Sequence, residues 1–186
     1  MTPADRELVT RIRAALPRQP CRVALSGLDG VGKSTLAATL ADALRLPVVR
    51  VPDRDRVAIM RAAGASPGSA QLLGLQAQLV DAPASVILDR GPLCVAAIHP
   101  EMAGLSRLLA RSQYVTTLLL DLPLEAARAR KPDPEAELRN RDREAARYRE
   151  LAGRWPRTVI LDASRPPGEV LSAALQAVAR AVGVAT

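Results

Sequence analysis

The sequence predicts an α/β fold in which helices cover both faces of a parallel β-sheet. Short apolar segments typical of strands alternate along the chain with longer segments whose apolar residues recur at helical spacing. Strands separated by helices in this way pair in parallel, because each helix returns the chain to the edge where the previous strand began. The 186 residues contain no internal repeat, low-complexity stretch or long linker, so we expect one domain, residues 1–186.

Five apolar segments are the predicted strands. The fourth of them is apolar enough to be buried on both faces of the sheet. The second is ended by Pro52, which cannot donate a backbone hydrogen bond. The segments are CRVALS (21–26), LPVVRV (46–51), SVILDR (85–90), YVTTLLLDL (114–122) and RTVILDAS (157–164).

Helical periodicity covers most of the remaining chain. In one helix Leu36, Leu40 and Leu44 recur every four residues, the spacing of a single buried face. The N-terminal segment, residues 1–20, is a helical extension, and residues 124–152 are a charged helical region interrupted by KPDPE, since proline resists helix continuation. The predicted helices are 5–16, 34–46, 54–63, 70–80, 101–112, 124–152 and 168–182.

The chain is strongly basic, with a formal net charge of +7 and a sequence pI of about 10.6. Arginine supplies almost all of the positive charge, since Lys33 and Lys131 are the only lysines. Such a charge fits either a nucleic-acid-binding surface or an enzyme that handles polyanions. We prefer the enzyme and do not expect a nucleic-acid partner, because the arginines do not form one continuous run.

The sequence also bears on the compartment. The context of the two cysteines, Cys21 and Cys94, argues against a disulfide framework or a metal site. No apolar run approaches the roughly 20 residues of a membrane helix, and the charged N-terminus lacks the apolar core of a signal peptide. We therefore expect a cytoplasmic protein with no membrane partner.

The segment GLDGVGKST, residues 27–35, matches the phosphate-binding pattern G-x-x-x-x-G-K-[ST]. Glycines let consecutive N–H groups point at an anion, and the following helix adds its positive end. A chance glycine-rich turn would also match, but the strand before the segment and the helix after it favour phosphate binding. Lys33 is expected to reach the β- and γ-phosphates of ATP, and Ser34 to bind Mg²⁺. The expected ATP-binding residues here are Gly27, Asp29, Gly30, Val31, Gly32, Lys33, Ser34 and Thr35.

Two predicted strands end in aspartate. Asp89 ends VILD, at the sheet edge where ligands of open α/β sheets bind, and can hold Mg²⁺ directly or through water. Arg90 follows it and can meet an acceptor phosphate. The alternative is a capping aspartate beside a surface arginine. For Asp121, at the end of LLLDL, we prefer the structural cap.

The charged region 124–152 has the composition of a lid over transferred phosphate. A lid shields the phosphoryl group from water, and its arginines stabilise the negative charge on that group during transfer. Around the KPDPE loop we favour this role for Arg128, Arg130 and Lys131, which with Lys33 and Arg90 are the predicted catalytic residues. For the outer residues we prefer a solvated helix with i,i+4 pairs; these are Arg139, Arg141, Arg143 and Arg147.

These pieces, in this order, resemble thymidylate kinase, a member of the nucleoside-monophosphate kinase group. GLDGVGKST resembles the family's G-x-D-G-x-GK-[ST]-T loop, and VRVPD lies where the family often has an R-E-P segment. VILDRGPLCVAAIH is similar to its D-R-Y-x-x-S-x-x-A-Y-Q stretch, and RYREL to its R-Y-x-E-L segment. The resemblance spans roughly residues 21–182, and only the phosphate loop is highly specific.

The resemblance implies the strand order 2-3-1-4-5, the cofactors ATP and Mg²⁺, and a nucleoside monophosphate as acceptor, with dTMP first. It places Asp29 near the acceptor's phosphate or sugar, and Arg90 and Arg50 on its phosphate. The lid arginines would grip the ATP phosphates, and the adenine would lie against Ala163, Ser164 and Arg165. A homodimer through helices beside the third strand is common in the family.

Departures from the family concentrate at the acceptor's base. Gly91 stands where the family has Tyr, and Cys94 where it has Ser. Its usual Arg for thymine is replaced by Gln76 or Gln78, and the chain has no Phe to stack on a base. His99 stands in place of the family's Gln, where it hydrogen-bonds the acceptor or caps the loop before Pro100.

Three functions follow. The first is a kinase of the thymidylate kinase type. The second is a kinase on the same scaffold with another acceptor, such as a nucleoside, a modified nucleotide or a small alcohol, which the altered base pocket motivates. The third is a nucleic-acid-binding P-loop ATPase, for which the chain is short and poor in stacking aromatic residues.

Overall fold

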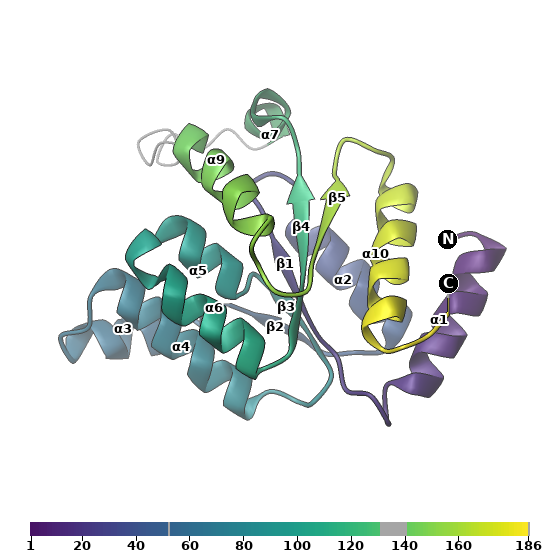
Figure 1. Cartoon of the computed structure of the whole chain (residues 1–186), viewed down its shortest axis with the longest axis horizontal. Helices are drawn as coiled ribbons and strands as arrows, with labels where there is room; N and C mark the ends of the chain where they lie inside the picture. Colours follow the sequence, from purple (N-terminus) through teal and green to yellow (C-terminus); the bar gives the residue numbers. More distant parts are fainter. Residues whose placement is uncertain (52, 131–140, 186) are drawn as a thin grey trace.

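The computed structural model describes residues 1–51, 53–130 and 141–185. Within them, five parallel strands form one sheet in the order β2-β3-β1-β4-β5, which confirms the predicted fold class and strand order. The sheet runs through the middle of the molecule with helices on either side (Figure 1). The strands are β1 (Arg22–Ser26), β2 (Val48–Arg50), β3 (Val86–Asp89), β4 (Val115–Asp121) and β5 (Thr158–Asp162).

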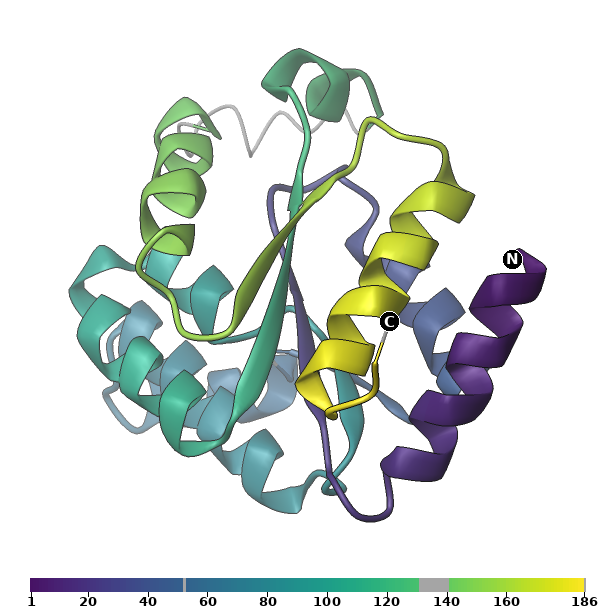
Figure 2. The same cartoon turned by 45° about the vertical axis from the view of Figure 1, so that its right-hand side comes forward.

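Three helices lie together on one face of the sheet: α1 (Pro3–Ala15), α2 (Lys33–Leu44) and α10 (Pro167–Ala181) (Figures 1 and 2). The N-terminal helix α1 is fastened to α10 by Asp5, whose Oδ1 accepts a 2.7 Å hydrogen bond from Ser172 Oγ. Asp5 also closes the capping box of α1 with Thr2. The N-terminal extension predicted from the sequence is thus an additional helix packed beside α10.

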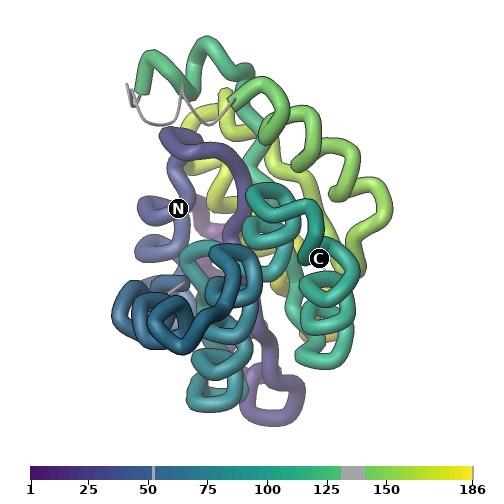
Figure 3. Tube along the Cα trace, turned by 90° about the vertical axis from the view of Figure 1, so that its left-hand side faces the viewer, coloured from purple at the N-terminus to yellow at the C-terminus, as the bar shows by residue number. Residues whose placement is uncertain are grey.

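The other face is covered by four helices and a 3₁₀ turn, η1 (Pro100–Met102). Of these, α5 packs against α4 and α6, and also against α9, which lies beside it in the view of Figure 3. The helices on this face are α3 (Arg54–Ala62), α4 (Pro67–Asp81), α5 (Pro92–Ile98) and α6 (Ala103–Ser112). The charged region contributes α7 (Leu124–Arg130) and α9 (Arg141–Ala152); the KPDPE sequence at 131–135 lies outside the described residues.

Side chains of the central strands alternate between two cores. Ile87 of β3 packs in the core under α1, α2 and α10, whereas Val86 and Leu88 pack in the core on the other face. β4 is buried along both faces up to Asp121, as its apolar sequence predicts. The two cores fix both faces of the sheet and so fix where its C-terminal edge presents functional residues.

The predicted elements occur with shifted ends, and two differences have a clear cause. α5 was not predicted, because its seven residues are too few to show a helical period; it starts at Pro92, a residue suited to the first helical position. α4 begins at Pro67 rather than at residue 70, because Ser66 Oγ caps it by accepting from the Ser69 N–H at 3.2 Å. None of the helices within the described residues is long and apolar enough to cross a membrane.

Candidate functional site

The loop between β1 and α2 has the backbone of a phosphate-binding loop. Gly27, Gly30 and Gly32 have φ angles of 132°, 89° and 97°, which favour glycine. At Gly27 the space is also closed, since a Cβ atom there would lie 2.5 Å from the backbone oxygen of Leu120. α2 begins directly after the loop at Lys33, so its N-terminus adds free N–H groups and positive potential.

Lys33 is buried against its own loop. Its Nζ donates hydrogen bonds to the carbonyl oxygens of Gly27 at 2.9 Å and Leu28 at 2.6 Å, and lies 3.4 Å from Asp29 Oδ1. Burial lowers the pKa of Lys33, because desolvation disfavours the charged ammonium. The ammonium is therefore held beside the loop that would receive phosphate.

Ser34 and Asp89 meet at the C-terminal edge of the sheet. Ser34 Oγ donates to Asp89 Oδ2 at 2.7 Å, and Arg50 Nε lies 3.7 Å from the same oxygen. A hydroxyl and a buried carboxylate supply the hard oxygen ligands that Mg²⁺ prefers, and the ion usually keeps water and phosphate as its other ligands. Among the described residues, no group of three or more His, Cys, Asp or Glu could hold a metal ion, and the Ser34–Asp89 pair offers two oxygen ligands.

Arg90 follows Asp89 in a strained backbone conformation. Its φ of 85° is unusual for a residue with a side chain. The side chain turns to Asp29, with Nη2 2.6 Å from Oδ1. Lys33 and Arg90 therefore share Asp29, which links the phosphate loop to the end of β3.

A cavity of about 500 Å³ opens beside this group, and we call it the arginine cavity. Its charged lining residues are four arginines and three carboxylates. The arginines come from four elements or their edges: Arg50, Arg54, Arg90 and Arg141. The carboxylates are Asp29, Asp89 and Glu144. A cavity with this lining favours an anionic ligand, because arginine binds oxyanions through paired N–H groups.

A second cavity of about 470 Å³ lies on the other side of the phosphate loop, and we call it the α10 cavity. Gly30, Gly32 and Thr35 line it from the loop and from α2. Arg130 lines it from α7 and points both Nη atoms at the Ala163 carbonyl oxygen, each at 3.4 Å. The remaining lining is largely apolar and includes Val31, Leu36, Val170 and Leu171.

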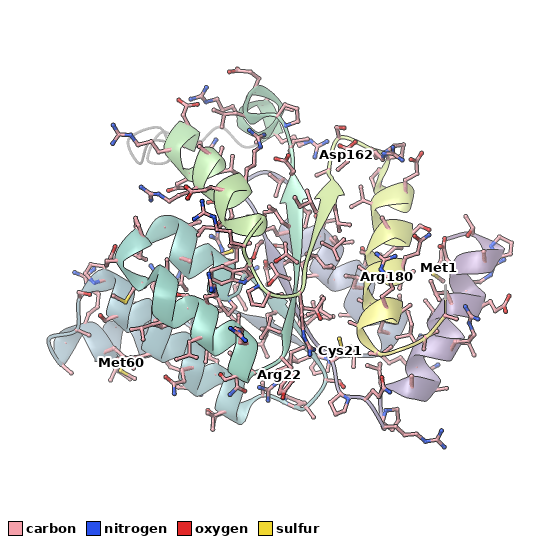
Figure 4. All side chains as sticks on the ribbon, viewed as in Figure 1. Met1, Cys21, Arg22, Met60, Asp162 and Arg180 are labelled. Carbon is pink, nitrogen blue, oxygen red and sulfur yellow. The ribbon has the colours of Figure 1, made fainter. Side chains whose placement is uncertain are left out.

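Ala163 and Arg165, from the loop after β5, both line this cavity. Ser164 does not line it; its N–H donates to Asp162 Oδ1 at 3.0 Å instead. Asp162 lies at the C-terminal end of β5 beside the start of α10, at the opposite sheet edge from Cys21 and Arg22 (Figure 4). Both cavities therefore lie at the edge where the strands of the parallel sheet end.

The structure does not bring Gln76 or His99 to the arginine cavity. Gln76 is exposed and lines neither cavity; Gln71 lines the arginine cavity, because five residues turn a helix about 140° past a full turn. Gln78 is buried as a structural link, donating to the Arg50 carbonyl oxygen at 2.9 Å. At the end of α5 it is Ile98 that lines the cavity, while His99 Nδ1 lies 3.6 Å from Glu101 Oε1 and burial lowers the pKa of His99.

The residues predicted to form a lid lie in different parts of the structure. Arg130 is at the α10 cavity, whereas Arg128 lines neither cavity and lies 3.2 Å from Glu125 and 3.8 Å from Asp142. Lys131 lies outside the described residues. Asp121 lines neither cavity and pairs with Arg149, whose Nη2 lies 3.1 Å from Oδ1, so its contact in the structure is an ion pair with α9.

Several cavity residues were not predicted, and one expectation was wrong. Arg141, interpreted from the sequence as solvated, is buried with 2% of its surface exposed and lines the arginine cavity. Glu144 and Tyr148 line it from the same helix, and the spacing i, i+3, i+7 was the available signal. Arg54 and Gln71 also line the cavity and were not predicted.

Close packing requires a small residue at Gly91, where the thymidylate kinase pattern that the sequence resembles has tyrosine. A Cβ atom at Gly91 would lie 2.5 Å from Ala24 Cβ, so no side chain fits there without moving β1. The aromatic residue of the cavity is instead Tyr148, whose pKa is raised well above its usual value by burial and by the neighbouring Cys94 thiol. The altered residue thus reflects close packing between α5 and the sheet.

No protein-family model and no curated protein matches the chain. Solved structures with a similar fold include the YorR protein of Bacillus subtilis in complex with phosphorylated GDP, at 16% identity and TM-score 0.63, covering 83% of this chain and 93% of that chain. Deoxyadenosine kinase from M. mycoides, with dCMP and dCDP bound, matches at 16% identity and TM-score 0.61, covering 83% and 96%. Shikimate kinase from Aquifex aeolicus matches at 19% identity and TM-score 0.61, covering 87% and 99%. At these identities the likeness shows the P-loop kinase fold.

Proposed function

We propose that the protein is an ATP-dependent phosphotransferase that moves the ATP γ-phosphoryl group to a small anionic acceptor. The observation that carries the proposal is the Ser34–Asp89 pair, which lies at a phosphate-binding loop with a cavity on either side. One cavity has an apolar lining suited to a base, and the other is lined by arginines. This arrangement suits a donor and an acceptor that meet at the loop.

The α10 cavity suits ATP. Its apolar walls can hold the adenine, with Ala163 and Arg165 at its border. The backbone N–H groups of the loop and the start of α2 would bind the phosphates. Arg130, at the same cavity, would neutralise phosphate charge, and we extend this role to Lys131 as a proposal from the sequence alone.

The Ser34 hydroxyl and the Asp89 carboxylate would hold Mg²⁺, which would supply positive charge against the phosphates. Lys33 would exchange its bonds to Gly27 and Leu28 for phosphate oxygens. Arg90 would turn from Asp29 toward the phosphoryl group or the acceptor. Catalysis would consist of positioning and charge neutralisation, with no covalent intermediate on the protein.

The arginine cavity suits the acceptor. Its volume of about 500 Å³ is within the range of small-molecule sites. Arg50 and Arg90 lie at the end nearest Asp89, where an acceptor phosphate would receive the transferred group. We propose a nucleoside monophosphate as acceptor, and dTMP first, because of the resemblance of the loop and the D-R segment to thymidylate kinase.

A second acceptor class is favoured by the lining of the same cavity. Tyr148 is its single aromatic side chain among the described residues, so a base would lack the ring on which the family stacks it. Arginines also bind carboxylates, and gluconate and shikimate kinases share the fold. The alternative is a hydroxy acid or another small alcohol, phosphorylated on a hydroxyl group.

The test is an acceptor panel. Purified protein with Mg-ATP is mixed with nucleoside monophosphates, nucleosides, hydroxy acids or no acceptor, and ADP and phosphorylated products are followed by chromatography. Lys33→Ala is the blank. Thymidine diphosphate formed with dTMP supports the first acceptor, and a product from another compound replaces it. ADP released without any phosphorylated acceptor, and stimulated by DNA or RNA, would contradict the kinase and favour a nucleic-acid-dependent ATPase.

A further inference from the structure

One face of α9 forms a wall of the arginine cavity. Arg141, Glu144 and Tyr148 follow the helical spacing i, i+3, i+7, and all three line the cavity. Arg141 is 2% exposed and Tyr148 4% exposed, so this polar face of the helix points into the protein. The exposed side of the same helix carries Arg143.

Tertiary contacts hold α9 in this orientation. Arg147 Nη1 donates to the Ala97 carbonyl oxygen of α5 at 2.9 Å. Arg149 Nη2 lies 3.1 Å from Asp121 Oδ1 at the end of β4. Tyr148, between them in the sequence, is buried. The place of Arg141 is therefore set by two attachments further along its own helix.

The charged region thus sends arginines to two different cavities. Arg130, from α7, lines the α10 cavity together with the phosphate loop. Arg141, from the start of α9, lines the arginine cavity with Arg54 and Arg90. Arg130 and Arg141 stand on either side of residues 131–140 in the sequence, and each lines a different cavity.

The charges of the arginine cavity favour an oxyanion near Arg141. Its lining holds four arginines against three carboxylates, so the cavity wall carries a net positive charge. A nearly buried guanidinium at a cavity wall gains most from a ligand that offers two oxygens in one plane, as phosphates and carboxylates do.

We propose that Arg141 is an acceptor-binding residue that binds an oxyanion of the acceptor, a phosphate or a carboxylate, from the α9 side. Assigning this cavity to the acceptor rests on the proposed function. Arg141 then decides acceptor affinity, whereas Arg130 decides ATP affinity. Glu144 and Tyr148 complete the wall and limit which acceptors fit beside the oxyanion.

Binding tests the proposal without turnover. Calorimetry without ATP compares dTMP, the neutral nucleoside thymidine, gluconate and shikimate on the wild type, Arg141→Gln and Arg141→Lys. We expect an oxyanion ligand to bind the wild type, to bind Arg141→Gln about tenfold or more weakly, and to be partly rescued by Arg141→Lys. Arg143→Gln, on the exposed side of α9, is the matched control and should bind as the wild type does. Circular dichroism verifies that each variant is folded. If Arg141→Gln does not fold, ligand binding by Arg141→Lys is compared with binding by the wild type.

The outcomes separate the two proposals. If dTMP alone binds and depends on Arg141, the oxyanion is a phosphate; if a hydroxy acid does, it is a carboxylate. Equal binding by wild type and Arg141→Gln, or no oxyanion binding by the wild type, overturns the role of Arg141. Binding that depends on Arg141 but gives no phosphorylated product with Mg-ATP overturns the kinase instead. Where product forms, Arg141→Gln should raise the acceptor KM and Arg130→Gln the ATP KM, each about tenfold.

Discussion

Ser34 Oγ and Asp89 Oδ2 are joined by a 2.7 Å hydrogen bond between residues 55 positions apart in the sequence. Ser34 lies in the first turn of α2, and Asp89 is the last residue of β3. They meet because β1 and β3 pair in parallel with Leu25 opposite Asp89, so the loop that follows β1 passes the end of β3. The pairing of the two strands thereby builds the proposed Mg²⁺ site.

Asp89→Asn should lower kcat/KM by about 100-fold or more, because a metal ion contributes several kcal/mol of charge stabilisation that the neutral amide supports poorly. The fold should persist, since an amide oxygen can still accept from Ser34. Kinetics at increasing Mg²⁺ concentration provide the measurement, and the variant should require more Mg²⁺.

Asp121→Asn is the matched control, since Asp121 ends β4 at the same edge of the sheet but pairs with the exposed Arg149. It should keep its activity and lose at most about 1 kcal/mol of stability. Equal loss of activity in the two variants would show that the position at the strand ends, rather than the metal site, matters.

Gly27→Ala should destabilise the protein more than Gly32→Ala. Both residues have positive φ, which costs a residue with a side chain about 1–2 kcal/mol. At Gly27 the new Cβ would also overlap the Leu120 oxygen at 2.5 Å, whereas no atom lies within 4 Å at Gly32. We expect losses of about 3 kcal/mol and about 1 kcal/mol in urea unfolding. Similar losses would mean that the backbone moves aside at Gly27.

Lys33→Met should change how stability depends on pH. Burial lowers the pKa of Lys33 below its ordinary value of 10.5, so between the lowered value and 10.5 the unfolded chain binds more protons than the folded one. In this window the unfolding free energy of the wild type should increase as pH rises toward 10.5 and decrease as pH falls. Lys33→Met should lack this pH-dependent contribution. Urea unfolding of both proteins from pH 7.5 to 10.5 measures the difference in their unfolding free energies. The contributions of the other titrating groups cancel in this difference. A constant difference would show that the pKa of Lys33 is not lowered in the folded protein.

Asp5→Ala should loosen α1 from α10. The variant loses the capping box with Thr2 and the bond from Ser172, together about 2 kcal/mol of unfolding free energy. The Thr2 N–H holds the pKa of Asp5 below its ordinary 3.8, so this stabilisation is present above pH 3.8 and is lost as the pH falls through the lowered value. Unfolding measured at pH 7 and at pH 3 should therefore give a larger difference in unfolding free energy between the variant and the wild type at pH 7.

Asp42→Ala, on the exposed side of α2, is the control and should change stability by less than about 0.5 kcal/mol. Below its melting temperature Asp5→Ala should keep its activity, because Asp5 lines neither cavity. Lost activity in a folded variant would instead assign α1 a part in the site.

Local sequence patterns determined the strands, most helices and the phosphate loop. Their signals lie in neighbouring residues: apolar runs for the strands, a four-residue recurrence in α2, and glycines at positions that need positive φ. Asp89 could be placed because it ends such a strand, and all parallel strands end at one edge. Helix α5 was not predicted, because its seven residues span too few turns to show a helical period.

Tertiary structure alone decided which side chains line the cavities. Gln71 and Gln76 lie on one helix, and only packing of α4 against the sheet turns the first toward the cavity. Arg141 and Arg143 differ by two positions, yet one is buried and the other exposed, because contacts of α9 with α5 and β4 fix its rotation. Helical periodicity in a sequence shows which residues share a face. The element that packs against that face is determined by contacts between residues far apart in the chain. For this protein the sequence therefore determined the phosphate loop and the fold, and the packing of helices decided the lining of the arginine cavity.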